Sequence, residues 1–210
     1  MALIIFDYDG VLADTLDDLI QAGQEACNQL GVIHLVTEDD INYLEEMSLA
    51  SYGRACGVPE HLVNKFVNIC INFIAEQISP PAIFKGLSRV VRHLSVNHMI
   101  AIVTTNSSQN VQAFLRRHGL DGLIHTVYGI DSPGSKAQKI SIARNRFLEN
   151  RKQEPVFMVG DSVSDILAAK EASVTSVAVT WGHQSLEKLL RSNPDHVVSS
   201  PLDLIGVIEP

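Results

Sequence analysis

Short apolar runs that alternate with helical patterns dominate the second half of this 210-residue chain. Such alternation is typical of a parallel sheet covered by helices, because each crossover between parallel strands needs a connecting helix. The sequence therefore predicts a doubly wound, Rossmann-like α/β sheet, which the apolar run at the N-terminus joins. The expected strands are 2–6, 99–103, 126–128, 156–159, 174–179 and 196–198.

The region between the first strand and residue 83 has a helical pattern instead. A helix is expected from residue 16 to Gly31, with Gly23 on its apolar face at a cost of about 1 kcal/mol relative to Ala. The pattern is helical again from 37 to about 78, and Pro80 and Pro81 then mark a linker. We expect a core domain of residues 1–14 and 84–210 and an inserted helical domain of residues 15–83.

The composition excludes several function classes. A net charge of −8 without a basic stripe argues against nucleic acid as a partner. No apolar run approaches the roughly 20 residues of a membrane helix, and Asp7 and Asp9 interrupt the N-terminal run, which does not resemble a signal peptide. We expect a cytoplasmic location, and the sequence leaves monomer and homodimer open. A small phosphorylated metabolite is compatible with an acidic protein if a metal ion and one or two local cations receive the phosphate. Cys27, Cys56 and Cys70 lack metal-ligand spacing and are expected to be buried thiols.

Polar residues directly after the predicted strands are candidates for the site, because ligands bind at the carboxyl ends of parallel strands. Asp7 and Asp9 follow the first strand, and Gly10 permits a sharp turn after them. A carboxylate such as Asp7 can attack phosphorus and form an aspartyl-phosphate. A second carboxyl group, Asp9, can protonate the leaving oxygen and later deprotonate water.

A second polar segment follows the strand at 99–103. Thr104, Thr105 and Asn106 offer a hydroxyl group and backbone N–H groups at the expected start of a helix, which suits a phosphate oxygen. The alternative is that Asn106 or Ser107 only caps this helix.

Charged residues complete the set. Lys136 can offset charge on the nucleophile and on the phosphoryl group, although Lys139 lies one helical turn away. Asp161 and Asp165, after the strand at 156–159, can complete an oxygen site for Mg²⁺ with Asp7 and Asp9. In the alternative interpretation, Asp161 or Ser162 only caps the next helix.

These segments together resemble the motifs of the haloacid dehalogenase superfamily, in its phosphoglycolate-phosphatase-like branch with a helical cap. The resemblance covers almost the whole chain and lies in FDYDGVLADT, in Thr104 of IVTTN, in Lys136 and in VGDSVSDI. It implies that Asp7 is the nucleophile and a metal ligand, and that Asp9 is the general acid/base and lends a backbone carbonyl to Mg²⁺. It also implies that Thr104 binds the phosphoryl group, Lys136 holds charge, Asp161 binds the metal and Asp165 supports it.

The resemblance favours a phosphatase, with a phosphomutase acting on a sugar phosphate as the alternative. Dehalogenases of the superfamily lack an acid at the position of Asp9. The chain departs from the family pattern at Ala137, where a proline normally follows the motif lysine. A signalling receiver domain also has an acidic pocket, but it needs no inserted helical domain. Four further residues are expected to be solvated or structural: Arg54, His61, Lys65 and His183.

Overall fold

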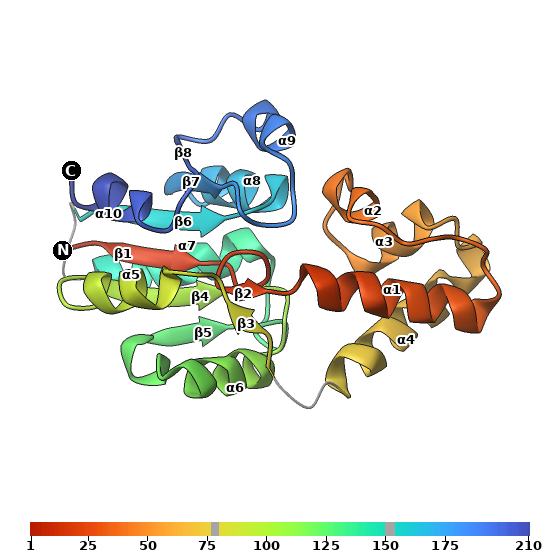
Figure 1. Ribbon diagram of the computed structural model, residues 1–210. Helices are drawn as coiled ribbons and strands as arrows, with labels where there is room; N and C mark the ends of the chain where they lie inside the picture. Colours follow the sequence, from red (N-terminus) through yellow and green to blue (C-terminus); the bar gives the residue numbers. More distant parts are fainter. Residues whose placement is uncertain (77–79, 150–153) are drawn as a thin grey trace.

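A six-stranded parallel sheet forms the centre of the computed structural model, which describes residues 1–76, 80–149 and 154–210 (Figure 1). The strand order is β5-β4-β1-β6-β7-β8, so the first strand lies in the middle and the chain builds the sheet outward on both sides. The predicted doubly wound α/β fold is confirmed. The strands are β1 (Leu3–Phe6), β4 (Met99–Val103), β5 (Thr126–Tyr128), β6 (Val156–Gly160), β7 (Thr175–Val179) and β8 (His196–Val198).

The central strand β1 is buried on both faces, because its side chains alternate between two apolar layers. Ile4 and Phe6 pack in the layer of α5, α6 and α10, whereas Leu3 and Ile5 pack in the layer of α7 and α8. Helices on both faces leave only the ends of the strands for a ligand. The helices of this part are α5 (Leu87–Leu94), α6 (Ser108–His118), α7 (Lys136–Leu148), α8 (Val163–Glu171), α9 (Leu186–Arg191) and α10 (Asp203–Ile208), with a 3₁₀ turn at Asp121–Leu123.

Four of the described helices lie between two short strands, β2 (Ala13–Asp14) and β3 (Ala82–Ile83). They have an apolar cluster of their own and lie beyond the carboxyl ends of the sheet strands (Figure 1). We call them the cap. Cys27, Cys56 and Cys70 are free and buried there, as expected. None of the helices in the described ranges is long and apolar enough to cross a membrane. The cap helices are α1 (Leu16–Leu30), α2 (Asp39–Asn42), α3 (Leu49–Ala55) and α4 (Glu60–Ala75).

The prediction of continuous helix from 37 to about 78 was wrong, because this range forms three separate helices, α2, α3 and α4. The chain turns between α2 and α3, where Ser48 caps the new helix, and again after α3. Gly57 has a positive φ of 76°, and Pro59 precedes α4, so neither continues a helix. The last residues of the expected range, 77 and 78, lie outside the described residues.

Two very short strands that the sequence did not predict join the cap to the sheet. β2 (Ala13–Asp14) pairs antiparallel with β3 (Ala82–Ile83), so the outgoing and returning segments lie side by side. Pro80 and Pro81, where the linker was expected, directly precede β3. The segments that enter and leave the cap are therefore paired with each other.

A second connection ties the cap to α9 and to the loop that precedes it. Lys188 is buried, and its Nζ donates to the carbonyl oxygens of Tyr43 (2.8 Å) and Leu44 and pairs with Glu45 (3.3 Å). Gln184 donates a further hydrogen bond to the Leu44 carbonyl at 2.9 Å. We call this connection the 43–45 contact.

Close packing against Tyr52 explains the glycine at position 23 of α1, which the helical pattern alone does not. A Cβ added there would lie 2.1 Å from the hydroxyl oxygen of Tyr52, which donates to the Leu19 carbonyl at 3.0 Å.

We predict that Gly23→Ala destabilises the protein, because overpacking costs about 1–3 kcal/mol and exceeds the helical gain of about 1 kcal/mol. The matched control is Gly206→Ala, in open space on α10, which should be neutral or stabilising. Chemical denaturation measures both, and a stabilised Gly23→Ala variant would contradict the prediction.

Replacing Lys188 by Met should loosen the 43–45 contact. The carbonyl groups of Tyr43 and Leu44 lose a buried donor, which we expect to cost about 1–3 kcal/mol. Amide hydrogen exchange around residues 43–45 should accelerate, whereas exchange in β1 should not. Lys65→Met, on the exposed face of α4, is the control. Equal exchange rates in wild type and Lys188→Met would show that the contact does not hold the cap.

Candidate active site

The carboxyl ends of three neighbouring strands bring the predicted residues together. Phe6 of β1 is in register with Ile102 of β4 and with Val159 of β6. The residues that follow these strands therefore reach the same edge of the sheet, and the Asp7 backbone N–H donates to the Val159 carbonyl at 2.9 Å. Carboxylate oxygens of Asp7, Asp161 and Asp165, all of them buried, lie within 4.8 Å of one another.

Lys136, the first residue of α7, reaches this group of carboxylates. Its Nζ lies 2.8 Å from Asp7 Oδ2 and 2.6 Å from Asp165 Oδ1. A capping box of Ser135 and Gln138 fixes the start of the helix that carries it. The rival Lys139 instead donates to the Gly129 carbonyl at 2.6 Å. Of the two candidate lysines, Lys136 is thus the one beside the carboxylates, although no proline follows it.

Asp9 lies beside the loop that follows β4. The Asn106 side-chain amide donates to both Asp9 carboxylate oxygens, at 3.3 and 3.1 Å. Thr104 is buried, and its Oγ1 accepts the Asn106 backbone N–H at 3.0 Å, whereas Thr105 is exposed. Ser107 rather than Asn106 caps α6, by accepting the Asn110 N–H. The Asn106 amide therefore faces Asp9.

Gly10 has no room for a side chain. Its φ is +72°, and a Cβ there would lie 2.0 Å from Asp161 Oδ2 and 2.6 Å from His183 Nδ1. The absence of a side chain at position 10 lets the Asp161 carboxylate approach the loop that carries Asp7 and Asp9.

His183 is a site neighbour that the sequence analysis treated as structural. Its backbone N–H donates to Asp161 Oδ2 at 2.7 Å, and its Nδ1 lies 3.1 Å from the same oxygen. Its Nε2 lies 3.2 Å from the Thr15 hydroxyl oxygen. Burial lowers the pKa of His183, but the Asp161 carboxylate, with Asp9 and Asp7, outweighs burial and raises the pKa to about 9. The signal that could have drawn attention to His183 is its place in the loop after a predicted strand, which Asp7, Thr104 and Asp161 share.

Asp161 and Asp165 have different surroundings. Ser162, not Asp161, caps α8, and its N–H and Oγ donate to Asp165 Oδ2 at 3.1 and 2.7 Å. With Lys136 on its other oxygen, Asp165 is held from both sides. Asp161 is not the helix cap of the alternative interpretation, and its carboxylate faces the Asp7–Gly10 loop.

Buried negative charge is the dominant electrostatic property of this group. Burial raises the pKa of Asp7, and Asp165 and Asp161 raise it further, although Lys136 opposes them. Burial also raises the pKa of Asp9, which the Asn106 hydrogen bond and His183 oppose. A divalent cation would offset this repulsion, and a set of carboxylate oxygens suits a hard cation such as Mg²⁺.

Comparison with known proteins places the chain in a family. The haloacid dehalogenase-like hydrolase family matches residues 4–179. A phosphoglycolate phosphatase of Vibrio parahaemolyticus is 30% identical over 98% of this chain and 95% of its own. One from Synechococcus elongatus is 28% identical over 99% and 97%. A haloacid dehalogenase-like hydrolase structure from Streptococcus pneumoniae shares the fold, with a TM-score of 0.86 and 24% identity over 99% and 98% of the two chains.

The family match spans the cap as well as the strands that carry the carboxylates. It argues against a receiver domain, for which the inserted helices have no role. The chain therefore belongs to the haloacid dehalogenase-like hydrolases and is a phosphatase of that family.

Proposed function

We propose that this phosphatase transfers the phosphoryl group of a small phosphomonoester to Asp7 and then hydrolyses the aspartyl-phosphate, with Mg²⁺ as cofactor. The observation that carries the proposal is the position of the Asp7 carboxylate, 2.8 Å from Lys136 and within 4.8 Å of Asp161. A buried carboxylate between a cation and further carboxylates suits covalent phosphoryl transfer. The relatives named above make phosphoglycolate the first substrate to test.

The residues that would hold the metal fit a magnesium ion. Asp7 and Asp161 would supply carboxylate oxygens, Asp9 its backbone carbonyl, and Asp165 would support the site from its place beside Lys136. When bound, Mg²⁺ would offset the carboxylate charge and neutralise charge on the phosphoryl oxygens. The excess of buried negative charge supports this assignment.

Asp9 would move the protons. In the first step, an Asp7 oxygen attacks phosphorus, the ester P–O bond breaks, and Asp9 gives its proton to the leaving oxygen. In the second, Asp9 takes a proton from water, the water oxygen attacks phosphorus, and the bond to Asp7 breaks to release phosphate. The raised pKa of Asp9 favours the protonated form that the first step needs. Asn106 would orient Asp9 through its two hydrogen bonds.

Phosphate oxygens would be bound by the remaining candidates. Thr104, Thr105 and Asn106 lie on the loop after β4, and Gly10 leaves the Asp7 loop open to close approach. The positive charge of Lys136 would stabilise both the transferring phosphoryl group and the Asp7 carboxylate.

The cap, which we assign to residues 15–83 against a core of residues 1–14 and 84–210, would close over the substrate. Closure excludes water other than the attacking molecule and supplies contacts to the rest of the substrate. A phosphomutase would use the same intermediate, but the two relatives named above are phosphatases and do not favour it.

Asp7→Asn is the direct test of the nucleophile. We expect kcat for phosphate release from phosphoglycolate or a sugar phosphate to fall by about 10³-fold or more, because an amide oxygen is a poor nucleophile. Asp121→Asn, the same change at an exposed position, should leave kcat unaltered. Circular dichroism checks that both variants fold. Undiminished release by Asp7→Asn would refute the assignment, and isomerised sugar phosphate without free phosphate would indicate a mutase.

Metal removal tests the cofactor. Chelation should abolish phosphate release, and Mg²⁺ should restore it. Independently of activity, Mg²⁺ should raise the Tm of the wild-type protein, because ligands of the folded state stabilise it. This shift should be lost in Asp161→Asn and kept in Asp203→Asn, at an exposed position in α10. Full activity after chelation would exclude a required metal.

A further inference from the structure

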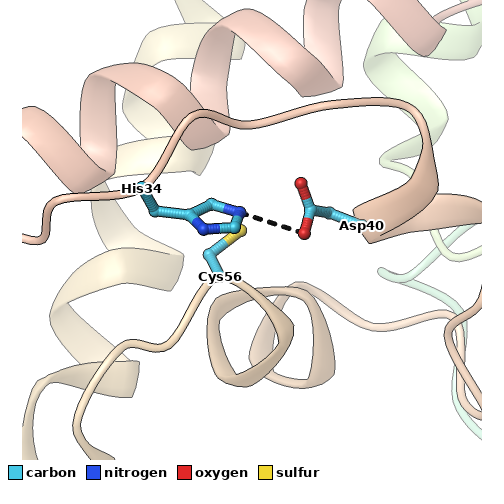
Figure 2. Close-up of side chains that lie close together, drawn as sticks. All are labelled: His34, Asp40 and Cys56. Atoms are coloured by element: carbon cyan, nitrogen blue, oxygen red, sulfur yellow. Dashed lines mark hydrogen bonds and ion pairs between the residues drawn. The ribbon is translucent and has the colours of Figure 1, made fainter.

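A second group of metal-ligating side chains lies in the cap, apart from the carboxylates at the strand ends. His34 belongs to the loop after α1, Asp40 to α2, and Cys56 directly follows α3 (Figure 2). His34 Nε2 lies 3.0 Å from Asp40 Oδ1. One ligand atom from each of the three residues lies within 4.8 Å of the other two. Bonds of about 2.0–2.3 Å in tetrahedral geometry place ligand atoms roughly 3.5 Å apart, so a small adjustment would admit an ion.

Hydrogen bonds outside the group hold the side chain of Asp40 and the backbone around His34 in place. Asp40 Oδ2 accepts from the Thr37 backbone N–H at 2.8 Å and from the Thr37 hydroxyl at 3.3 Å. Gln24 of α1 fixes the His34 loop on both sides: it donates to the His34 carbonyl at 3.1 Å and accepts the Val36 N–H at 3.0 Å. Such partners orient ligands before a metal arrives.

The group is buried on the side of Cys56 and partly exposed to solvent on the side of His34 and Asp40. Cys56 is 1% exposed, whereas the side chains of Asp40 and His34 are 14% and 30% exposed. His34 also lines a surface depression together with Gln24 and Asn28. An ion could enter from this side, and water could fill a fourth coordination position there.

The donor atoms differ from those of the candidate active site. One nitrogen, one oxygen and one sulfur favour Zn²⁺, whereas Asp7, Asp161 and Asp165 offer oxygen alone. Burial raises the pKa of Cys56, and Cys27 and Asp40 raise it further, so the sulfur carries its proton when no metal is bound. A bound cation would replace that proton.

We propose that His34, Asp40 and Cys56 form a zinc-binding site in the cap. On binding, the Cys56 thiol releases its proton to solvent, and the sulfur, a His34 nitrogen and an Asp40 oxygen bind Zn²⁺. The hydrogen bond between His34 and Asp40 gives way to these bonds. The ion would link the loop after α1, α2 and the end of α3, and would therefore stabilise the cap. The proposal does not depend on the phosphatase mechanism.

Co²⁺ serves as the spectroscopic probe. Chelator-treated full-length protein is titrated with Co²⁺ in the presence of excess Mg²⁺. We expect a thiolate-to-cobalt charge-transfer band in the near ultraviolet that saturates at one equivalent and disappears when Zn²⁺ is added. The oxygen-only site cannot give this band, so the readout is specific for a sulfur ligand.

Substitution of the proposed ligands tests whether the charge-transfer band arises from them. Cys56→Ala and His34→Gln should lose it and bind Zn²⁺ at least tenfold more weakly, whereas Cys70→Ala, at another buried thiol of the cap, should keep both. Zn²⁺ should raise the Tm of wild type and Cys70→Ala only. His34→Gln changes a partly exposed loop residue and tests the site even if Cys56→Ala does not fold. Absence of the band in wild type, or its survival in a folded Cys56→Ala or His34→Gln variant, would overturn the proposal.

Discussion

The ion pairs of Lys136 with Asp7 and Asp165 are the interaction on which the site geometry depends. They join the end of β1 to the first turns of α7 and α8, three elements far apart in the sequence. Removal of one partner from a buried ion pair typically destabilises strongly, because an uncompensated charge remains. Lys136 also lowers the pKa of Asp7, against burial and the Asp165 and Asp161 carboxylates, which together still raise that pKa to about 8.

The sequence predicted the sheet and the cluster of carboxylates for one physical reason. Parallel strands end at the same edge, so polar residues directly after apolar runs must converge. Asp7, Thr104 and Asp161 all follow this rule. The choice of Lys136 over Lys139 did not follow from spacing, because only the direction in which α7 packs on the sheet separates the two lysines.

Other features lay beyond sequence reasoning because they depend on contacts between distant segments. The pairing of β2 with β3 involves two residues on each side, too few for any periodicity. His183 follows a predicted strand, but its contact with Asp161 depends on the path of the loop after β7, which turns back onto that carboxylate. The proximity of His34, Asp40 and Cys56 arises only when α1, α2 and α3 pack together, since their spacing along the chain resembles no metal motif.

One loop connects the cap with the carboxylates. His183 contacts both Asp161 and Thr15, at the start of α1, and the neighbouring Gln184 contacts Leu44 in the cap. Movement of the cap therefore has a direct physical route to the group that faces Asp7.

The crowding at Gly10 constrains how this protein can diversify. The space that a side chain would need is filled by Asp161 and His183, so substitution there disturbs the carboxylates themselves. Position 10 is consequently closed to any side chain, and variation that leaves these carboxylates in place has to arise elsewhere in the chain.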